Sequence, residues 1–169
     1  MTCHPQTPAT AVKSIEASVE RTPDRVRLEF RMACQTDEVV LPDRATRPER
    51  RDGLWQTTCF EMFVGGDSYC EFNFSPSLNW AAYDFDGYRA GSKPRPVSRA
   101  PEIAVEGTQD CLVLRATLFD THLAGRLALA AVIEETDGTK SYWALVHPPG
   151  QPDFHHPACF AATLPAPGA

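Results

Sequence analysis

Residues 54–89 most constrain the fold, because two aromatic-rich runs flank the turn signal Gly65-Gly66-Asp67. Neighbouring side chains of a strand point to opposite faces. One face of this predicted hairpin is almost wholly apolar: Phe60, Met62, Val64, Cys70, Phe72 and Phe74. The other mixes rings, acids and an amide: Trp55, Thr57, Cys59, Glu61, Tyr69, Glu71, Asn73 and Ser75. The apolar face predicts a core, and the mixed face is either a recognition surface or a solvated outer surface.

Short alternating segments recur along the rest of the chain. Further strands are predicted over 12–20, 26–32, 36–41, 80–88, 103–105, 112–118, 127–134, 140–147 and 159–164. The Ala and Leu content of 127–134 would also suit a helix, and 121–125 favours a single helical turn. Roughly ten strands without a long helix predict an all-β protein, an antiparallel β-sandwich or jelly roll. We expect one domain over 1–169, with loose tails at 1–10 and 165–169.

The charge and hydropathy of the chain bear on its partners. A net charge of -6 argues against a nucleic-acid partner, and the Arg-rich run 44–51 is read as a solvated loop. No apolar run approaches the roughly 20 residues that span a bilayer, and the first residues do not resemble a signal peptide. We therefore expect a cytoplasmic protein without a membrane partner.

Six cysteines are present, and none belongs to a pair with zinc-site spacing. Most fall within predicted strands, where a thiol behaves as a small apolar group. Cys59 and Cys70 lie near each other in the predicted hairpin but point to opposite faces, so a disulfide between them is not expected. Free thiols are expected in a reducing compartment.

The third central strand, 80–88, repeats the two-sided pattern. Ala81, Tyr83, Phe85 and Gly87 fall on one side; Trp80, Ala82, Asp84, Asp86 and Tyr88 fall on the other. If the second side joins the mixed face of the hairpin, one surface carries Glu61, Glu71, Asn73, Trp80 and Asp86. Sugars are bound by rings that stack on pyranose faces and by acids and amides that pair with hydroxyls. Alternatively, Trp80 caps the core and the acids are solvated.

A second group of polar residues lies near the C-terminus. His147, Asp153, His155 and His156 have ligand atoms suited to a divalent metal, but their spacing matches no compact metal motif. The same loop is also interpreted as the rim of a site, with its side chains bonded to its own backbone. Haem is disfavoured because Met32 and Met62 are predicted to face the core. We therefore expect no resident cofactor, with metal or haem as a minor alternative.

Evidence for catalysis is weaker in the sequence. Glu61 and Glu71 suit the acid and base pair of a glycosidase, although carboxylates on neighbouring strands are common. No nucleophile elbow and no Gly-rich phosphate loop is present.

The run 54–89 together with WALVHPPGQPDFHHP, within 142–160, resembles bacterial DOMON-like proteins, which are related to family 9 carbohydrate-binding modules. The resemblance implies a β-sandwich with its ligand, a sugar or haem, against one sheet. Two departures weaken the analogy for the ligand: the extracellular modules are secreted and joined to enzymes, and axial haem ligands are not apparent. By position the resemblance implies a site of Trp55, Glu61, Glu71, Asn73, Trp80, Tyr88, Trp143, His147, Asp153 and His155.

The resulting hypothesis is a non-catalytic module for a small polar ligand, most plausibly a saccharide or a cell-wall-derived sugar. Its candidate residues are the set implied by the resemblance together with Asp86. A hydrolase or isomerase using Glu61 and Glu71 is the main alternative. The sequence does not indicate an oligomeric state.

Overall fold

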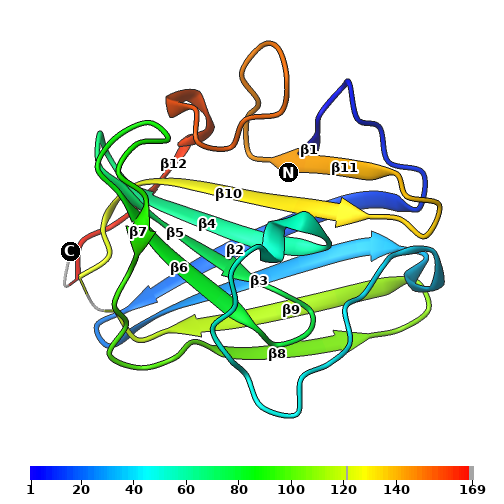
Figure 1. The fold of residues 1–169 in the computed structure, drawn as a ribbon, viewed down its shortest axis with the longest axis horizontal. Coiled ribbons are helices and arrows are strands. Elements are labelled where there is room, and N and C mark those ends of the chain that lie inside the picture. The colour runs from blue at the N-terminus through cyan, green and yellow to red at the C-terminus, as the bar shows by residue number, and fades with distance from the viewer. Residues whose placement is uncertain (121, 168–169) are drawn as a thin grey trace.

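The computed structural model describes residues 1–120 and 122–167, which form two antiparallel sheets packed face to face (Figure 1). The larger sheet has eight strands, and the smaller has four. In the larger sheet the spatial order is β1 (Thr2–Cys3), β11 (Lys140–Ala144), β10 (Gly125–Glu134), β4 (Cys59–Gly65), β5 (Tyr69–Phe74), β6 (Trp80–Phe85) and β7 (Lys93–Pro94), and β12 (Ala162–Leu164) pairs with β10. In the smaller it is β2 (Val12–Thr22), β3 (Arg25–Cys34), β9 (Cys111–Leu118) and β8 (Glu102–Gly107). The predicted all-β sandwich is confirmed.

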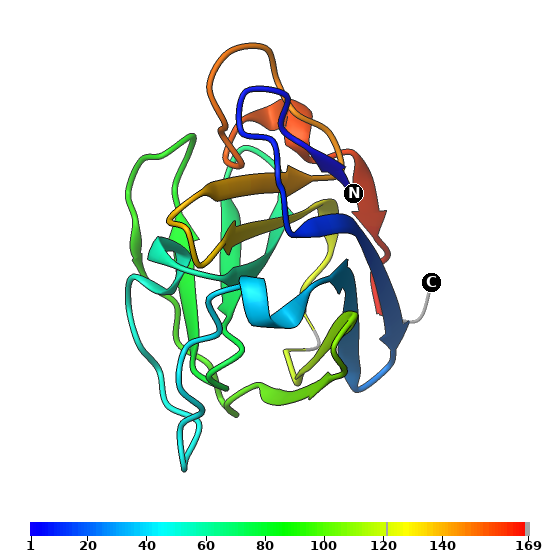
Figure 2. The same cartoon turned by 90° about the vertical axis from the view of Figure 1, so that its right-hand side faces the viewer.

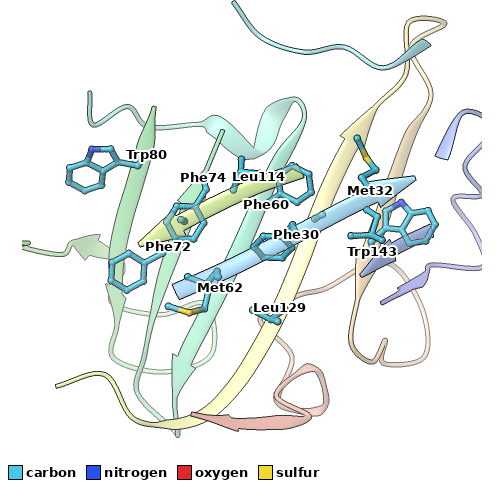
Figure 3. Packing of buried hydrophobic residues seen from close by; sticks show 14 of the residues in the cluster. Phe30, Met32, Phe60, Met62, Phe72, Phe74, Trp80, Leu114, Leu129 and Trp143 are labelled. Atoms are coloured by element: carbon cyan, nitrogen blue, oxygen red, sulfur yellow. The ribbon is translucent and has the colours of Figure 1, made fainter. Parts of the chain in front are cut away.

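The core lies between the sheets and follows the alternation of side chains. Along β3, Val26, Leu28, Phe30 and Met32 are buried, while Arg27 and Arg31 are exposed. The opposite sheet contributes the predicted apolar face of the hairpin, together with Leu127, Leu129, Ala131 and Ile133 of β10. Figure 3 shows Phe30, Phe60, Phe72 and Phe74 among the packed side chains of this core. Each fully buried large side chain of this kind contributes about 1.5–3 kcal/mol of transfer free energy.

Residues 127–134 form a strand, so the helical alternative for this segment is wrong. β10 pairs with β4 on one side and with β11 and β12 on the other, and nearly all of its residues are buried. A strand covered on both faces has no polar face, which explains its uniform Ala and Leu content.

Two predicted strands are partly replaced by short 3₁₀ helices. Within 36–41, η1 (Thr36–Glu38) is a single turn, closed by a bond from Glu38 N–H to the Gln35 carbonyl, and Val39 makes an isolated bridge with Glu135. Within 159–164, η3 (Pro157–Cys159) precedes β12 and is capped by His156, whose Nδ1 accepts from Ala158 N–H. Proline at its first position favours such a turn over a strand.

The N-terminal stretch is not loose, contrary to expectation. Thr2 and Cys3 pair with Ala144 and Trp143, the terminal ammonium donates to the Ile15 carbonyl at 2.8 Å, and His4 is buried. Figure 2 shows this segment beside the loop that follows β11. Thr121, which begins the predicted helical turn, and residues 168–169 of the predicted C-terminal tail lie outside the described residues.

Candidate functional site

The candidate site lies on the outer face of the larger sheet, the side turned away from the core. Strand pairing brings Glu61 opposite Asn73, and Glu71 opposite both Phe63 and Tyr83. Because paired residues share a face, the polar side chains of three adjacent strands form one surface. The mixed face predicted for the hairpin is therefore continuous with the Tyr83 side of β6.

Loops cover much of this outer face, so it is not a solvated surface. Phe154, Cys159 and Phe160 of the segment that follows β11 pack on Phe63, Tyr69 and Phe85, together with Ala128, Ala130, Val132 and Ala144 of the sheet. This second apolar cluster places the 152–160 loop against the strands. A hollow remains between that loop and η2 (Leu54–Gln56).

The hollow is a cavity of about 740 Å³, a size typical of small-molecule sites. Rings and carboxyl groups dominate its wall. The lining residues are Asp52, Gly53, Trp55, Gln56, Glu61, Glu71, Tyr83, Phe85, Arg89, Ser92, Val132, Tyr142, Pro152, Phe154 and His155.

Glu61 and Glu71 form the floor of the cavity and are 3% and 6% exposed. Glu71 accepts a hydrogen bond from Asn73 Nδ2 at 2.8 Å, whereas the Glu61 carboxyl has no hydrogen-bond partner among the described residues. Burial, and then repulsion from Glu71, raise the pKa of Glu61 well above its usual range. Burial also raises the pKa of Glu71 to about 7, although the Asn73 bond and Arg89 oppose this. Near neutral pH this pair therefore retains at least one proton.

His155 lies beside the pair, and its contacts assign the tautomer. The Tyr69 hydroxyl accepts from Arg89 N–H at 3.3 Å and lies 2.8 Å from His155 Nδ1, and we assign its proton to the bond with Nδ1. The ring proton is thus on Nε2, 3.8 Å from Glu71 Oε2. Burial lowers the pKa of His155 to about 4, so the imidazole is neutral at physiological pH.

Asp153 links the two sides of the cavity rim through hydrogen bonds. It accepts hydrogen bonds from the Tyr88 hydroxyl at 2.5 Å, from Arg89 Nη2 at 2.8 Å and from the His155 backbone N–H at 3.2 Å. Although burial opposes it, these donors lower the pKa of Asp153. The 152–160 loop is thereby joined to the 86–91 turn on the other side of the opening.

Several residues predicted from the sequence do meet at this cavity. Trp55, Glu61, Glu71 and His155 line it directly. Asn73 is fully buried behind Glu71 and supports it, while Tyr88 and Asp153 form the rim contact described above. Trp55 is 53% exposed and reaches the cavity from η2 rather than from the hairpin strand.

Trp80 and Trp143 are corrections, because both side chains belong to the core. Trp80 pairs with Phe74, and Trp143 pairs with Ala131, so the two indoles share the inner face of the sheet. Figure 3 shows them at opposite margins of the core cluster. The assignment of the two sides of 80–88 was therefore inverted: Ala81, Tyr83 and Phe85 share the face of Glu71.

Asp86 and His147 are also separate from the cavity. Asp86 is exposed beyond the end of β6 and pairs with Lys93 Nζ at 2.9 Å. His147 Nε2 lies 3.0 Å from the Thr2 carbonyl oxygen, and its ring packs edge-on against His4. His147 is thus held by the N-terminal segment. The sequence pattern gave no indication that this segment lies beside His147.

The sequence reasoning missed most of the wall, including its remaining rings and charged groups: Asp52, Tyr83, Phe85, Arg89, Tyr142 and Phe154. Tyr83 and Phe85 had the right alternation but were assigned to the wrong face. Tyr142 could have been found from its position next to Trp143, because neighbours in a strand face opposite sides. No local signal marks Phe154 or Asp52, because loop packing places them.

The cysteines are unpaired, and the candidate metal ligands do not gather at one point of the described chain. All six cysteines are free; Cys59 lies on the outer face and Cys70 in the core, as the hairpin pattern predicted. Within 1–120 and 122–167, no group of three or more His, Cys, Asp or Glu side chains is arranged to hold a metal ion. Met32 and Met62 are core residues.

Comparison of the chain with protein-family models, curated proteins and solved structures gave no match. In the part of the chain that the structure describes, no helix has the length and apolar character needed to cross a membrane.

Proposed function

We propose that this protein is a binding module for a small saccharide, held in the cavity on the outer face of the larger sheet. The observation that carries the proposal is the buried, unpartnered carboxyl of Glu61 at the floor of a cavity lined by rings. Because Glu61 borders the cavity, a ligand that enters there meets a hydrogen-bonding group that no described residue engages.

The arrangement of the wall suits a sugar ring. Trp55, Tyr83 and Tyr142 offer apolar faces, and Glu61, Glu71 and the Nε2–H of His155 offer acceptors and a donor at one end. A pyranose has the same division into apolar faces and a hydroxyl periphery. The resemblance of 54–89 and 142–160 to DOMON-like proteins and family 9 carbohydrate-binding modules supports the same assignment. The free thiols accord with a cytoplasmic location, which we also propose.

Tryptophan fluorescence titration against a panel of neutral, amino and acidic sugars tests the proposal. Trp55 is the exposed indole at the cavity, whereas Trp80 and Trp143 are buried. A saturable change in emission is expected, and it should disappear in Trp55→Phe, whose binding is then followed by calorimetry. If no sugar in the panel binds to the folded protein by either method, the proposal is wrong.

A hydrolase or isomerase acting on a sugar is a second candidate. The observation that favours it is that both Glu61 and Glu71 are buried with raised pKa values, as expected of a general acid and its partner. Incubation with aryl glycosides, and with reducing sugars in deuterated water, would report turnover. Turnover by the wild type that Glu61→Gln abolishes supports an enzyme. If a sugar binds to the protein but is not turned over, the binding module is the remaining proposal.

A further inference from the structure

We infer that the ligand carries a protonated amino group, and that the sugar bound in this cavity is an amino sugar rather than a neutral one. The sugar part of this inference rests on the proposed function. The cationic part rests on the charges and rings of the cavity itself.

The charged groups around the cavity are unevenly compensated. Three acids line it, namely Asp52, Glu61 and Glu71, and Arg89 is the one arginine or lysine among the described lining residues. Arg89 is already paired with Asp153 at 2.8 Å. The protein thus provides a partner for its cation but not for both acids on the floor.

His155 does not supply the missing positive charge. Its Nδ1 accepts the hydrogen bond from Tyr69, and the ring lies against Phe63 and Phe85 with centroids 5.2 and 5.0 Å away. Protonating an imidazole in these surroundings is unfavourable, and burial lowers its pKa to about 4. His155 therefore adds no positive charge beside Glu71, and a second cation there, beyond the Arg89 that is paired with Asp153, would come from the ligand.

The rest of the wall is suited to an ammonium group. Trp55, Tyr83, Phe85, Tyr142 and Phe154 all line the cavity, and the negative faces of such rings attract cations. Glu61 is 3% exposed and unpartnered, so an N–H donor reaching the floor meets a free acceptor. A neutral hydroxyl would satisfy a hydrogen bond, whereas an ammonium group also compensates the negative charge that the glutamate pair carries when it ionises.

Calorimetric titration at about pH 7 with four probes separates the two parts of the inference. D-Glucosamine, D-glucose and N-acetyl-D-glucosamine differ at one ring substituent, and cyclohexylamine supplies the ammonium without hydroxyls. We expect glucosamine to bind about tenfold or more tightly than either neutral sugar, the size of one desolvated charge pair or cation–π contact.

Matched variants locate the effect. Glu61→Gln keeps the shape of the side chain and removes its ability to ionise when a cation binds, so it should lower the preference for glucosamine to less than about threefold. Glu106→Gln, an exposed acid of β8 on the other sheet, should leave the preference unchanged. Should Glu61→Gln not fold, Trp55→Ala changes a half-exposed ring and should weaken amine binding instead.

The pH dependence gives an independent readout with cyclohexylamine, which stays protonated throughout. The groups that face the pair are Asn73, Tyr83, His155, Arg89, Cys59 and Tyr69, with Asp52 bonded to Tyr83. Burial raises the pKa of the Cys59 thiol and that of the Tyr69 hydroxyl, so both stay protonated in this range. Since His155 is neutral, Tyr83 protonated and Arg89 charged, the glutamate pair governs titration from about pH 6 to 8. A cation prefers the ionised pair, so affinity should rise with pH in the wild type and less in Glu71→Gln.

The outcomes distinguish the two proposals. Tighter binding of glucosamine supports both, and binding of cyclohexylamine without any sugar supports the cationic ligand but contradicts the saccharide. Equal or tighter binding of glucose overturns the amino-group inference and leaves the saccharide proposal intact. If neither amine binds to the folded protein, the inference is wrong.

Discussion

At the scale of residues, Glu61 and Glu71 are the most consequential side chains of this protein. Neither is needed to fill the core, because both lie on the outer face of the sheet and border a cavity. Burying two carboxyl groups there costs free energy that apolar residues of similar volume would not cost. That cost is the reason for assigning the pair to a ligand rather than to the fold.

The same burial predicts how stability depends on pH. The pKa of Glu71 is about 7 in the folded state and near 4.5 when the chain is unfolded. The folded state therefore binds the proton more tightly, and stability should fall as pH rises from about 4.5 to 7, by roughly 3 kcal/mol for Glu71 alone. Glu71→Gln should flatten this decline in urea denaturation series. An unchanged slope in that variant would contradict the assignment.

The tryptophans show why the sequence could not place every site residue. Alternation correctly separated Glu61 and Glu71 from Phe60 and Phe72, because a hairpin with a tight turn has a fixed register. Trp80 follows a longer connection, 75–79, in which Leu78 has a φ of 73°. The turn is closed by Ser75 N–H, which donates to the Asn79 carbonyl, and by Leu78 N–H, which donates to the Ser75 carbonyl. Nothing in the pattern of 80–88 says which of its faces joins that of Glu71.

At the scale of elements, the β4–β5 hairpin sets the positions of both glutamates, and Gly65 sets the hairpin. Its φ is 147°, and a Cβ placed there would lie 2.4 Å from the Ser68 carbonyl oxygen and 2.6 Å from Tyr69 Cα. At Gly66 the space is open. The two glycines therefore form a matched pair within one turn.

We predict that Gly65→Ala destabilises the protein by at least about 1 kcal/mol, because backbone atoms must move to admit the methyl group. Gly66→Ala should stay within about 0.5 kcal/mol of the wild type. Chemical denaturation of both variants measures the difference. Equal effects would show that the turn does not have the conformation described here.

The 152–160 loop is the second element on which the cavity depends, and Asp153 holds it. Asp153→Ala removes the bonds to Tyr88, Arg89 and the His155 backbone. We predict a stability loss of about 1 kcal/mol, faster amide hydrogen exchange in the loop, and weaker binding.

Asp86→Asn is the control for this prediction, since Asp86 is an exposed acid whose side chain is paired with Lys93 rather than with the 152–160 loop. It should leave loop exchange and binding unchanged. Binding that survives Asp153→Ala at full strength would mean that the loop is not needed to form the site.

At the scale of the whole molecule, the sandwich follows from sequence alternation, whereas the cavity does not. β3 and the hairpin carry readable patterns because one face of each meets the core and the other does not. The covers of the outer face, η2 and the 152–160 loop, lack such periodicity, and long-range packing on Phe63 and Tyr69 positions the loop. The two glutamates of the hairpin were therefore predictable from alternation, whereas the face of β6 and loop residues such as Phe154 and Arg89 were not.

The six thiols test the packing of the whole molecule at once. Cys34, Cys59, Cys70 and Cys159 are buried, and Cys3 and Cys111 are partly exposed. Burial raises the pKa of Cys70 to about 12 and that of Cys34 and Cys159 to about 11, and thiolates are the species that react.

A thiol-reactive disulfide reagent at neutral pH should therefore label at most Cys3 and Cys111 rapidly, with the other four labelled in step with global unfolding. Cys111→Ser should remove part of the fast phase. Rapid labelling of Cys34 and Cys70 in the folded protein would mean that the two sheets separate far more readily than their shared core implies, and rapid labelling of Cys159 would mean that its loop lifts from the outer face.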